Sequence, residues 1–281
     1  MSSCEDGSCR FHMAGESVLA SPDTFDHNTP WKFYNHLIEG IPSDIAVTDY
    51  CMGVDWGYVE AECGMGVGHT VHGGANHKFN DDPRKYDLKS LAQLSKSWNF
   101  EEASLGVAAL NAWYSQYDKI VELGGTFDDK GDKKKDREEA FGAMREDYEG
   151  KNVTVIGHFP NVVGMAKVAN LTVLERSCNS ALDTPDPACE YVLPLQDYVF
   201  LTGTTITNKT APRLLELSKN AITTMVGPST IPSEFLFKWD VNVLAGSAVV
   251  DPESAKFAIK GGSKELFERG IKKYILRSQG K

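Results

Sequence analysis

The stretch VTVIGHFPNVVGMAKVANLTVLE, Val153 to Glu175, decides the fold. Two runs of β-branched residues flank a turn and an apolar helical stretch, which predicts strand, turn, helix and strand. A dinucleotide-binding unit would carry Gly-x-Gly-x-x-Gly after its first strand. Here a single glycine, Gly157, is followed by the letters HFP. The stretch therefore predicts a βαβ unit without the glycine pattern that binds a pyrophosphate.

The rest of the second half repeats this alternation. Continuous apolar runs predict strands at 152–157, 171–175, 197–203, 221–227 and 241–247, with helical stretches such as APRLLELSKN between most of them. Apolar strands joined by crossover helices are typical of a parallel sheet covered on both faces. The predicted fold class is therefore α/β, with a Rossmann-like domain at the C-terminal end of the chain.

The first half has a different pattern. A helix is predicted at 29–41, followed by extended pieces at 44–53, 55–63 and 65–74 and by helices at 88–98 and 100–123. The extended pieces are rich in β-branched and aromatic residues and are broken by glycine, which favours an antiparallel meander. This half is predicted to be a smaller α+β domain.

A charged run, residues 128–151, separates the two halves and predicts a solvated helix or linker. The expected organisation is a flexible N-terminal segment at 1–28, an α+β domain at 29–127, the charged linker or helix at 128–151, and the Rossmann-like domain at 152–281.

Composition excludes some partners. The 281 residues are 41% hydrophobic and carry 29 basic against 39 acidic side chains, a net charge of −10. Such a chain repels nucleic acid and anionic membranes. The N-terminus lacks the apolar region of a signal peptide, and no apolar run is long enough to span a bilayer. Six scattered cysteines suit a reducing compartment, so a cytoplasmic location is expected.

Small and polar residues follow every predicted strand of the second half. Because ligands bind beyond the carboxyl ends of parallel strands, we expect a binding site there. The alternative is that these residues only form turns and helix caps. The candidate ligand-binding residues are Gly157, His158, Pro160, Glu175, Gly203, Thr204, Thr205, Asn208, Gly227, Pro228, Ser229 and Gly246.

His158 and Glu175 have the most specific chemistry of these candidates. An imidazole before a helix can be a metal ligand, an acid, a base or a capping group. Glu175 stands where dinucleotide-binding domains hold a ribose hydroxyl, but it can equally bind a metal or a cation, or pair with Arg176. Together the two residues are the candidate metal ligands of this half.

A second candidate metal cluster is Cys63, His69, His72 and His77, and Cys4, Cys9 and His12 form a weaker third one near the N-terminus. Thiolate and imidazole suit transition metals. The spacing matches no zinc finger, and solvent-facing histidines are the favoured alternative. No Gly-x-Ser-x-Gly, Walker A, His-Glu-x-x-His or Cys-x-x-Cys motif is present, so the sequence fixes no reaction.

The second half resembles the putative heavy-metal chelation domain family, through VIGHFPNVVGMAKVANLTVLE, LPLQDYVFLTGTTITNKTAPRLLELS, MVGPSTIPSEFLFKWDVNVLAGSAVVDPES and GGSKELFERGIKKY. The first half resembles its companion domain, which has an enolase-N-terminal-like fold, through DWGYVEAE, GMGVGHT and SLAQLSKSWNFEEASLGVAALNA. The resemblance implies a cleft between the two domains in a cytoplasmic protein of prokaryotic, often anaerobic, origin. It also adds Asp197 to the expected pocket residues.

The expected function is binding of a metal ion, or of a metal-chelating or anionic small molecule, in that cleft. The resemblance implies a transition metal of unspecified identity as the cofactor or cargo, or a metal-bearing molecule such as a corrinoid precursor. The alternative is a Rossmann-type enzyme that acts on a nucleotide-like or corrinoid-precursor metabolite. Catalysis and homo-oligomer formation both stay open, and no nucleic-acid or membrane partner is expected.

Overall fold

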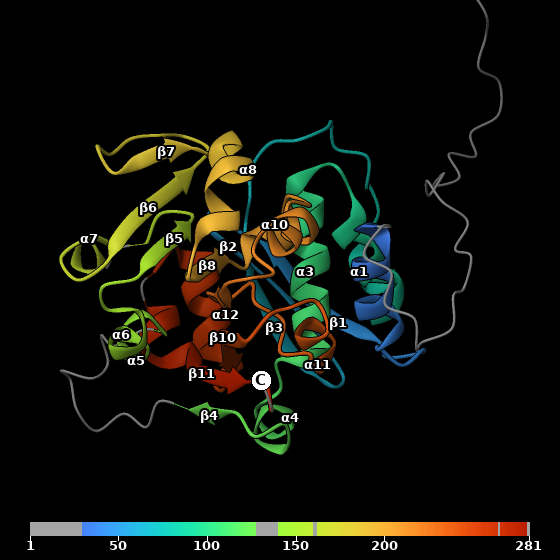
Figure 1. Cartoon of the computed structure of the whole chain (residues 1–281). Coiled ribbons are helices and arrows are strands. Elements are labelled where there is room, and N and C mark those ends of the chain that lie inside the picture. The colour runs from blue at the N-terminus through green and yellow to red at the C-terminus, as the bar shows by residue number, and fades with distance from the viewer. Residues whose placement is uncertain (1–29, 128–139, 160–161, 264, 280–281) are drawn as a thin grey trace, which may run out of the picture.

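The computed structural model describes residues 30–127, 140–159, 162–263 and 265–279. The expected flexible segment at 1–28, the N-terminal cysteine and histidine cluster, and Pro160 lie outside these ranges. In Figure 1 the first half (blue to green) and the second half (yellow-green to red) lie side by side. Among the helices of the described residues, none has the length and apolar character needed to cross a bilayer.

The first half contains a three-stranded antiparallel sheet in the order β1-β2-β3. Its strands are β1 (Val47–Met52), β2 (Trp56–Ala61) and β3 (Gly64–His69). The predicted meander is therefore confirmed. The accompanying helices are α1 (Pro30–Glu39), η1 (Pro83–Lys85), α2 (Leu88–Ala92), η2 (Gln93–Lys96), α3 (Phe100–Tyr114) and α4 (Tyr117–Glu122).

Helix α3 packs closely on this sheet. Its N-terminus is capped by Asn99, whose side-chain oxygen accepts a hydrogen bond from the backbone N–H of Glu102. A Cβ atom on Gly66 of β3 would lie 2.0 Å from the backbone nitrogen of Ala112. Glycine at this position therefore allows the helix backbone to approach the strand.

The second half is built on an eight-stranded sheet in the order β4-β11-β10-β9-β8-β5-β6-β7. Strands β5 to β10 run parallel, whereas β11 pairs antiparallel with β10 and β4 pairs antiparallel with β11. The strands are β4 (Thr126–Phe127), β5 (Asn152–Ile156), β6 (Asn170–Glu175), β7 (Asp183–Pro185), β8 (Tyr198–Thr202), β9 (Ile222–Val226), β10 (Val243–Val249) and β11 (Ile271–Arg277).

Helices cover both faces of this sheet, which confirms the predicted α/β class. Along β8, Val199 and Leu201 pack into one hydrophobic cluster while Phe200 packs into another. The helices are α5 (Ala140–Ala143), α6 (Arg145–Tyr148), α7 (Val162–Met165), η4 (Asp186–Ala188), α8 (Cys189–Val192), η5 (Leu193–Leu195), α9 (Thr204–Thr207), α10 (Ala211–Leu217), α11 (Glu234–Phe237), α12 (Pro252–Gly261) and the π-helical turn η6 (Leu266–Gly270).

The two halves share a core. Rings of Phe33 from α1 and Trp239 from the second half meet edge to face at 5.3 Å. The buried hydroxyl of Tyr34 donates a hydrogen bond of 2.8 Å to the carbonyl oxygen of Ile206. On another side, Tyr58 of β2 packs with Ala255 and Ala258 of α12. The interface is therefore apolar and hydrogen-bonded, and it fixes the first half against the large sheet.

The described part of the expected charged linker or helix, which begins at residue 140, is helical and partly buried. Helices α5 and α6 lie within residues 140–148 and bury Phe141 and Tyr148 in the same hydrophobic cluster as Phe200 of β8. Strand β4, at the end of the expected first domain, joins the large sheet through β11. The sequence patterns did not single out β11. Alternating strands and helices predict parallel strands joined by crossover helices, whereas β11 pairs antiparallel with β10.

Candidate functional site

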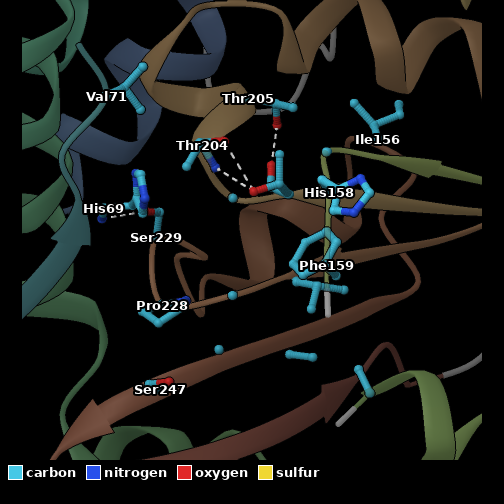
Figure 2. A pocket seen from close by; sticks show the side chains of 18 of the residues that line it. His69, Val71, Ile156, His158, Phe159, Thr204, Thr205, Pro228, Ser229 and Ser247 are labelled. Carbon is cyan, nitrogen blue, oxygen red and sulfur yellow. Dashed lines mark hydrogen bonds between the residues drawn. The ribbon is translucent and has the colours of Figure 1, made fainter. Parts of the chain in front are cut away.

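A cavity with a volume of about 1130 Å³ lies at the carboxyl ends of the parallel strands. The second half supplies most of its wall. The first half closes it with Trp56 of β2 and with residues 69–72 at the end of β3. Figure 2 shows His69 and Ser229 on one side of the cavity and His158 and Phe159 on the other. Both halves therefore contribute side chains to one site.

The strand order explains why the cavity forms here. Strands β5, β6 and β7 extend the sheet in one direction, and β8, β9 and β10 extend it in the other. The connections therefore diverge between β5 and β8, and such a switch point leaves a crevice beyond the strand ends. Gly157 follows β5 and Gly203 follows β8, and both line the cavity.

Eleven of the thirteen residues expected at the site line this cavity. They are Gly157, His158, Glu175, Gly203, Thr204, Thr205, Asn208, Gly227, Pro228, Ser229 and Gly246. Pro160 lies outside the described residues. Asp197 is not among the lining residues. It precedes β8, and its carboxylate accepts a hydrogen bond of 2.9 Å from the backbone N–H of Asn152 at the opposite edge of the sheet.

Backbone geometry at three glycines shapes the cavity floor. Gly157 and Gly227 have φ angles of +97° and +102°, in the region that L-residues rarely adopt. At Gly203 the constraint is contact, because a Cβ atom would lie 2.6 Å from backbone atoms of both Ser229 and Thr230. The turns after β5, β8 and β9 therefore depend on glycine.

A group of threonine hydroxyls stands at the switch point. The Oγ1 atoms of Thr202 and Thr204 are 3.0 Å apart, and Thr205 Oγ1 donates a hydrogen bond of 2.8 Å to the carbonyl oxygen of Thr202 (Figure 2). A hydroxyl both donates and accepts. This group therefore offers polar contacts to a ligand without placing a fixed charge in the cavity.

The loop after β9 is fastened to the first half. Ser229, which is 2% exposed, accepts a hydrogen bond of 2.9 Å at its Oγ from the backbone N–H of His69. Asn111 of α3 donates from Nδ2 to the carbonyl oxygens of Val67 and Pro228, both at 3.0 Å. These contacts join the two halves at the cavity wall.

Two histidines of the first half lie in different electrostatic environments. Burial lowers the pKa of His69, because desolvation disfavours the imidazolium, and the charge of Asp55 opposes this effect. The carbonyl oxygen of Val54 and the carboxylate of Glu101 raise the pKa of His72, whose ring nitrogens lie 2.9 Å and 3.2 Å from them. Near neutral pH, His69 therefore favours the neutral form and His72 the charged form more than an isolated histidine does.

The acid at the end of β6 is not paired with the arginine beside it. Arg176 directs its Nε to Asp186 at 3.0 Å. Glu175 Oε1 instead accepts hydrogen bonds from the backbone N–H groups of Arg176 and Ser177, at 2.8 Å and 3.4 Å. The simplest alternative for Glu175, an ion pair with its neighbour, is therefore not formed.

His158 has a partner that the sequence reasoning missed. Its Nδ1 lies 3.3 Å from Oδ1 of Asp183 at the start of β7, and the Asp183 side chain is only 1% exposed. Hydrogen bonds from the backbone N–H groups of Asn179 and Ser180, together with His158, lower the pKa of Asp183 despite some desolvation. This carboxylate therefore stays ionised next to the imidazole.

The described residues do not fit a metal cage made by the protein alone. Within them, no group of three or more histidine, cysteine, aspartate and glutamate side chains comes together to hold a metal ion. The cluster in the first half is dispersed: Cys63 Sγ contacts the carbonyl oxygen of Ala112, while His72 and His77 pair with Glu101 and Glu102.

Aromatic and charged residues complete the wall and were not expected from the sequence. Trp56 meets Phe267 edge to face at 5.2 Å, and both line the cavity with Phe159 and Lys273. Their positions depend on long-range packing between the halves and on the unexpected strand β11. Alternation around β2 and β11 is the only local signal, and it gives no indication of which face meets a ligand.

Comparison with known proteins agrees with this architecture. The family model DUF364, described as "putative heavy-metal chelation", matches residues 139–277, and the model DUF4213, with the same description, matches residues 34–114. An uncharacterized protein of Methanocaldococcus jannaschii is 30% identical over 257 residues, which cover 86% of this chain and 93% of that protein.

Two solved structures are similar along nearly their whole length. A DUF364-family protein of unknown function from Desulfitobacterium hafniense has a TM-score of 0.76 and 33% identity, covering 88% of this chain and 98% of that one. A DUF364-family protein from Pyrococcus horikoshii has a TM-score of 0.73 at 23% identity, covering 89% and 99%, and supports the fold alone. The chain belongs to the DUF364 family of putative heavy-metal chelation proteins.

Proposed function

We propose that this protein binds an organic, anionic or metal-chelating small molecule in the cavity between its two halves, and that a metal ion enters as part of that ligand. The observation that carries the proposal is the cavity itself. Its volume of about 1130 Å³ exceeds what a bare ion occupies and lies slightly above the range of small-molecule sites, about 300–1000 Å³.

The cavity wall supports an organic occupant. Aromatic rings of Trp56, Phe159 and Phe267 provide apolar contact, while hydroxyls of Thr204 and Ser229 provide a small number of directed polar contacts. Such a mixture is typical of sites that bind metabolites. Arg176 and Lys273 line the cavity beside the acids Glu175 and Asp186, and Arg176 pairs with Asp186, so the wall offers contacts to both anionic and cationic groups of an occupant.

The family description supports a metal, and the donor set determines how that metal would be held. His158 and Glu175 both line the cavity, but neither belongs to a group of three protein donors among the described residues. A chelating ligand would supply the missing donor atoms. We therefore propose that His158 and Glu175 contact a metal that is already held by the chelating ligand, and that they do not form a closed protein cage around a bare ion.

An enzyme is the second candidate, and the strand order favours it. The sequence β7-β6-β5-β8-β9-β10 puts His158 beside the switch point, where α/β enzymes bind nucleotide-like substrates. Turnover of a nucleotide-like or corrinoid-precursor metabolite that disappears in His158→Ala would support catalysis. Stoichiometric binding without turnover would support the binding function.

The proposal is tested by native mass spectrometry and elemental analysis of protein purified anaerobically without chelators. We expect an added organic mass in the wild type, and less of it in Glu175→Gln and in His158→Ala. Glu190→Gln is the matched control, because Glu190 is an exposed acid that pairs with Arg213 outside the cavity. Equal occupancy in all four proteins would contradict the proposed site.

A further inference from the structure

His158, which lines the cavity, forms a pair with Asp183, and the geometry of this pair determines which nitrogen of the His158 ring carries the proton. Asp183 Oδ1 lies 3.3 Å from His158 Nδ1. The other carboxylate oxygen, Oδ2, accepts hydrogen bonds of 2.8 Å from the backbone N–H groups of both Asn179 and Ser180. The two backbone hydrogen bonds to Oδ2 therefore fix the orientation of the carboxylate, and Oδ1 faces the imidazole.

The burial of the pair is asymmetric. The Asp183 side chain is 1% exposed, whereas the His158 side chain is 48% exposed and lines the cavity. Within the described residues, His158 Nε2 has no hydrogen-bond partner, in contrast to Nδ1. An ionised carboxylate only accepts hydrogen bonds, so the ring nitrogen that faces it must carry the proton.

We propose that Asp183 is a positioning residue that holds His158 in its Nδ1–H tautomer, so that Nε2 offers a lone pair to the ligand. The inference rests on the proposed function, because it describes how the same cavity recognises its occupant. A carboxylate that orients a histidine in this way recurs in catalytic and ligand-binding sites. The ligand group that meets Nε2 is then either a hydrogen-bond donor, such as a hydroxyl, an amine or an amide N–H, or the metal ion that the ligand carries.

Asp183→Asn distinguishes this role from a structural one. The two backbone N–H groups at Asn179 and Ser180 need an acceptor, so the carboxamide oxygen of the variant must face them. Its NH₂ group then faces His158 Nδ1 and requires a lone pair there. The variant therefore keeps the loop and reverses the tautomer.

The measurement is long-range ¹H–¹⁵N correlation NMR of the histidine rings in the full-length protein, after dialysis against EDTA and at about pH 8, where imidazole is mostly neutral. His158→Gln assigns the resonances. We expect the Nδ1–H form in the wild type, although free histidine favours Nε2–H, and the Nε2–H form in Asp183→Asn. Asp186→Asn removes a nearby charge without touching the ring and should leave the tautomer unchanged.

Two results would overturn the inference. One is an Nε2–H tautomer in the wild type, a reading that needs no variant and stands even if Asp183→Asn does not fold. The other is a folded Asp183→Asn protein that keeps the Nδ1–H form. Native mass spectrometry of wild-type protein taken before the EDTA dialysis separates the two proposals: a bound organic mass with the wrong tautomer contradicts only the role of Asp183, whereas the expected tautomer without any ligand contradicts only the proposed function.

Discussion

The backbone N–H of His69 lies 2.9 Å from Ser229 Oγ and donates a hydrogen bond to it across the boundary between the two halves. His69 ends β3 of the small sheet, and Ser229 belongs to the turn after β9 of the large one. Both residues line the cavity, so this bond joins the two halves at the cavity wall. The cavity is therefore a product of the interface between the halves.

Asn111 is expected to be the strongest single polar link across this interface. It is 1% exposed, and its Nδ2 donates to Val67 and Pro228. Asn111→Ala leaves two carbonyl oxygens without a donor, and each such loss costs about 1–3 kcal/mol. We expect a loss of about 3 kcal/mol in the free energy of unfolding, measured by urea denaturation.

Asn170→Ala is the control for that substitution. Asn170 makes an exposed side-chain hydrogen bond of 3.3 Å to Asn152. Its removal should change the free energy of unfolding by less than about 0.5 kcal/mol. Equal losses in the two variants would show that the buried hydrogen bond to Pro228 contributes no more to the free energy of unfolding than an exposed one.

Gly203→Ala should disturb the cavity. The new Cβ would lie 2.6 Å from backbone atoms of Ser229 and Thr230, which cannot move aside as a flexible side chain can. Overpacking of this kind costs about 1–3 kcal/mol. Because the displaced turn forms part of the wall, ligand occupancy by native mass spectrometry should fall as well.

Gly261→Ala provides the comparison, since no atom lies within 4 Å of a Cβ at that position. Gly261 ends α12, so alanine should leave stability unchanged or raise it by up to about 1 kcal/mol. If Gly203→Ala behaved like Gly261→Ala, the close contact at the switch point would not constrain the site.

Lys209 should make stability depend on pH. Its amine donates to the carbonyl oxygens of Ser97 and Thr207, and burial lowers its pKa from 10.5 to about 7, against the attraction of Glu102. Between those pH values the unfolded chain holds a proton that the folded chain has lost, so the free energy of unfolding rises with pH. Below pH 7 both states are charged and the cost of burying the charge is fully present.

Lys209→Met tests this dependence. Urea unfolding of the wild type and the variant from about pH 7 to about pH 10 should give a smaller rise in the variant. Lys119, whose pKa burial lowers to about 8, contributes with the same sign in both proteins and cancels in the comparison. Parallel stability curves would mean that Lys209 titrates normally.

The two histidines at the cavity should titrate in a fixed order. His72 is expected to lose its proton at higher pH than His69, because Val54 and Glu101 stabilise its charged form while burial destabilises that of His69. His72 therefore favours folding at low pH, and this contribution is lost as pH rises through its raised pKa. Ring-proton NMR titration measures both values, and the reverse order would contradict the assigned contacts.

Local patterns predict much of this architecture. The strands β5, β6, β8, β9 and β10 follow from continuous β-branched runs, and their parallel arrangement brings Gly157, Thr204 and Ser229 to one edge. The convergence of these strand ends could be predicted because it follows from sheet geometry. Local residue types, combined with the geometry of parallel sheets, were sufficient to predict this edge of the sheet.

Long-range contacts account for what the sequence did not reveal. Asp183 reaches His158 through a turn that its own backbone hydrogen bonds create, and spacing alone does not reveal such a turn. Trp56 enters the cavity only because β2 packs against α12 and η6. Asp197 was expected at the site from resemblance, yet its place before β8 puts it at the other end of the strand.

Crystallography with anomalous scattering on protein purified anaerobically without chelators tests the central claim most directly. We predict electron density for an organic molecule between His158, Thr204 and Ser229, with any anomalous peak bonded to that molecule. A metal ion coordinated only by protein side chains, or an organic ligand bound outside this cavity, would contradict the account.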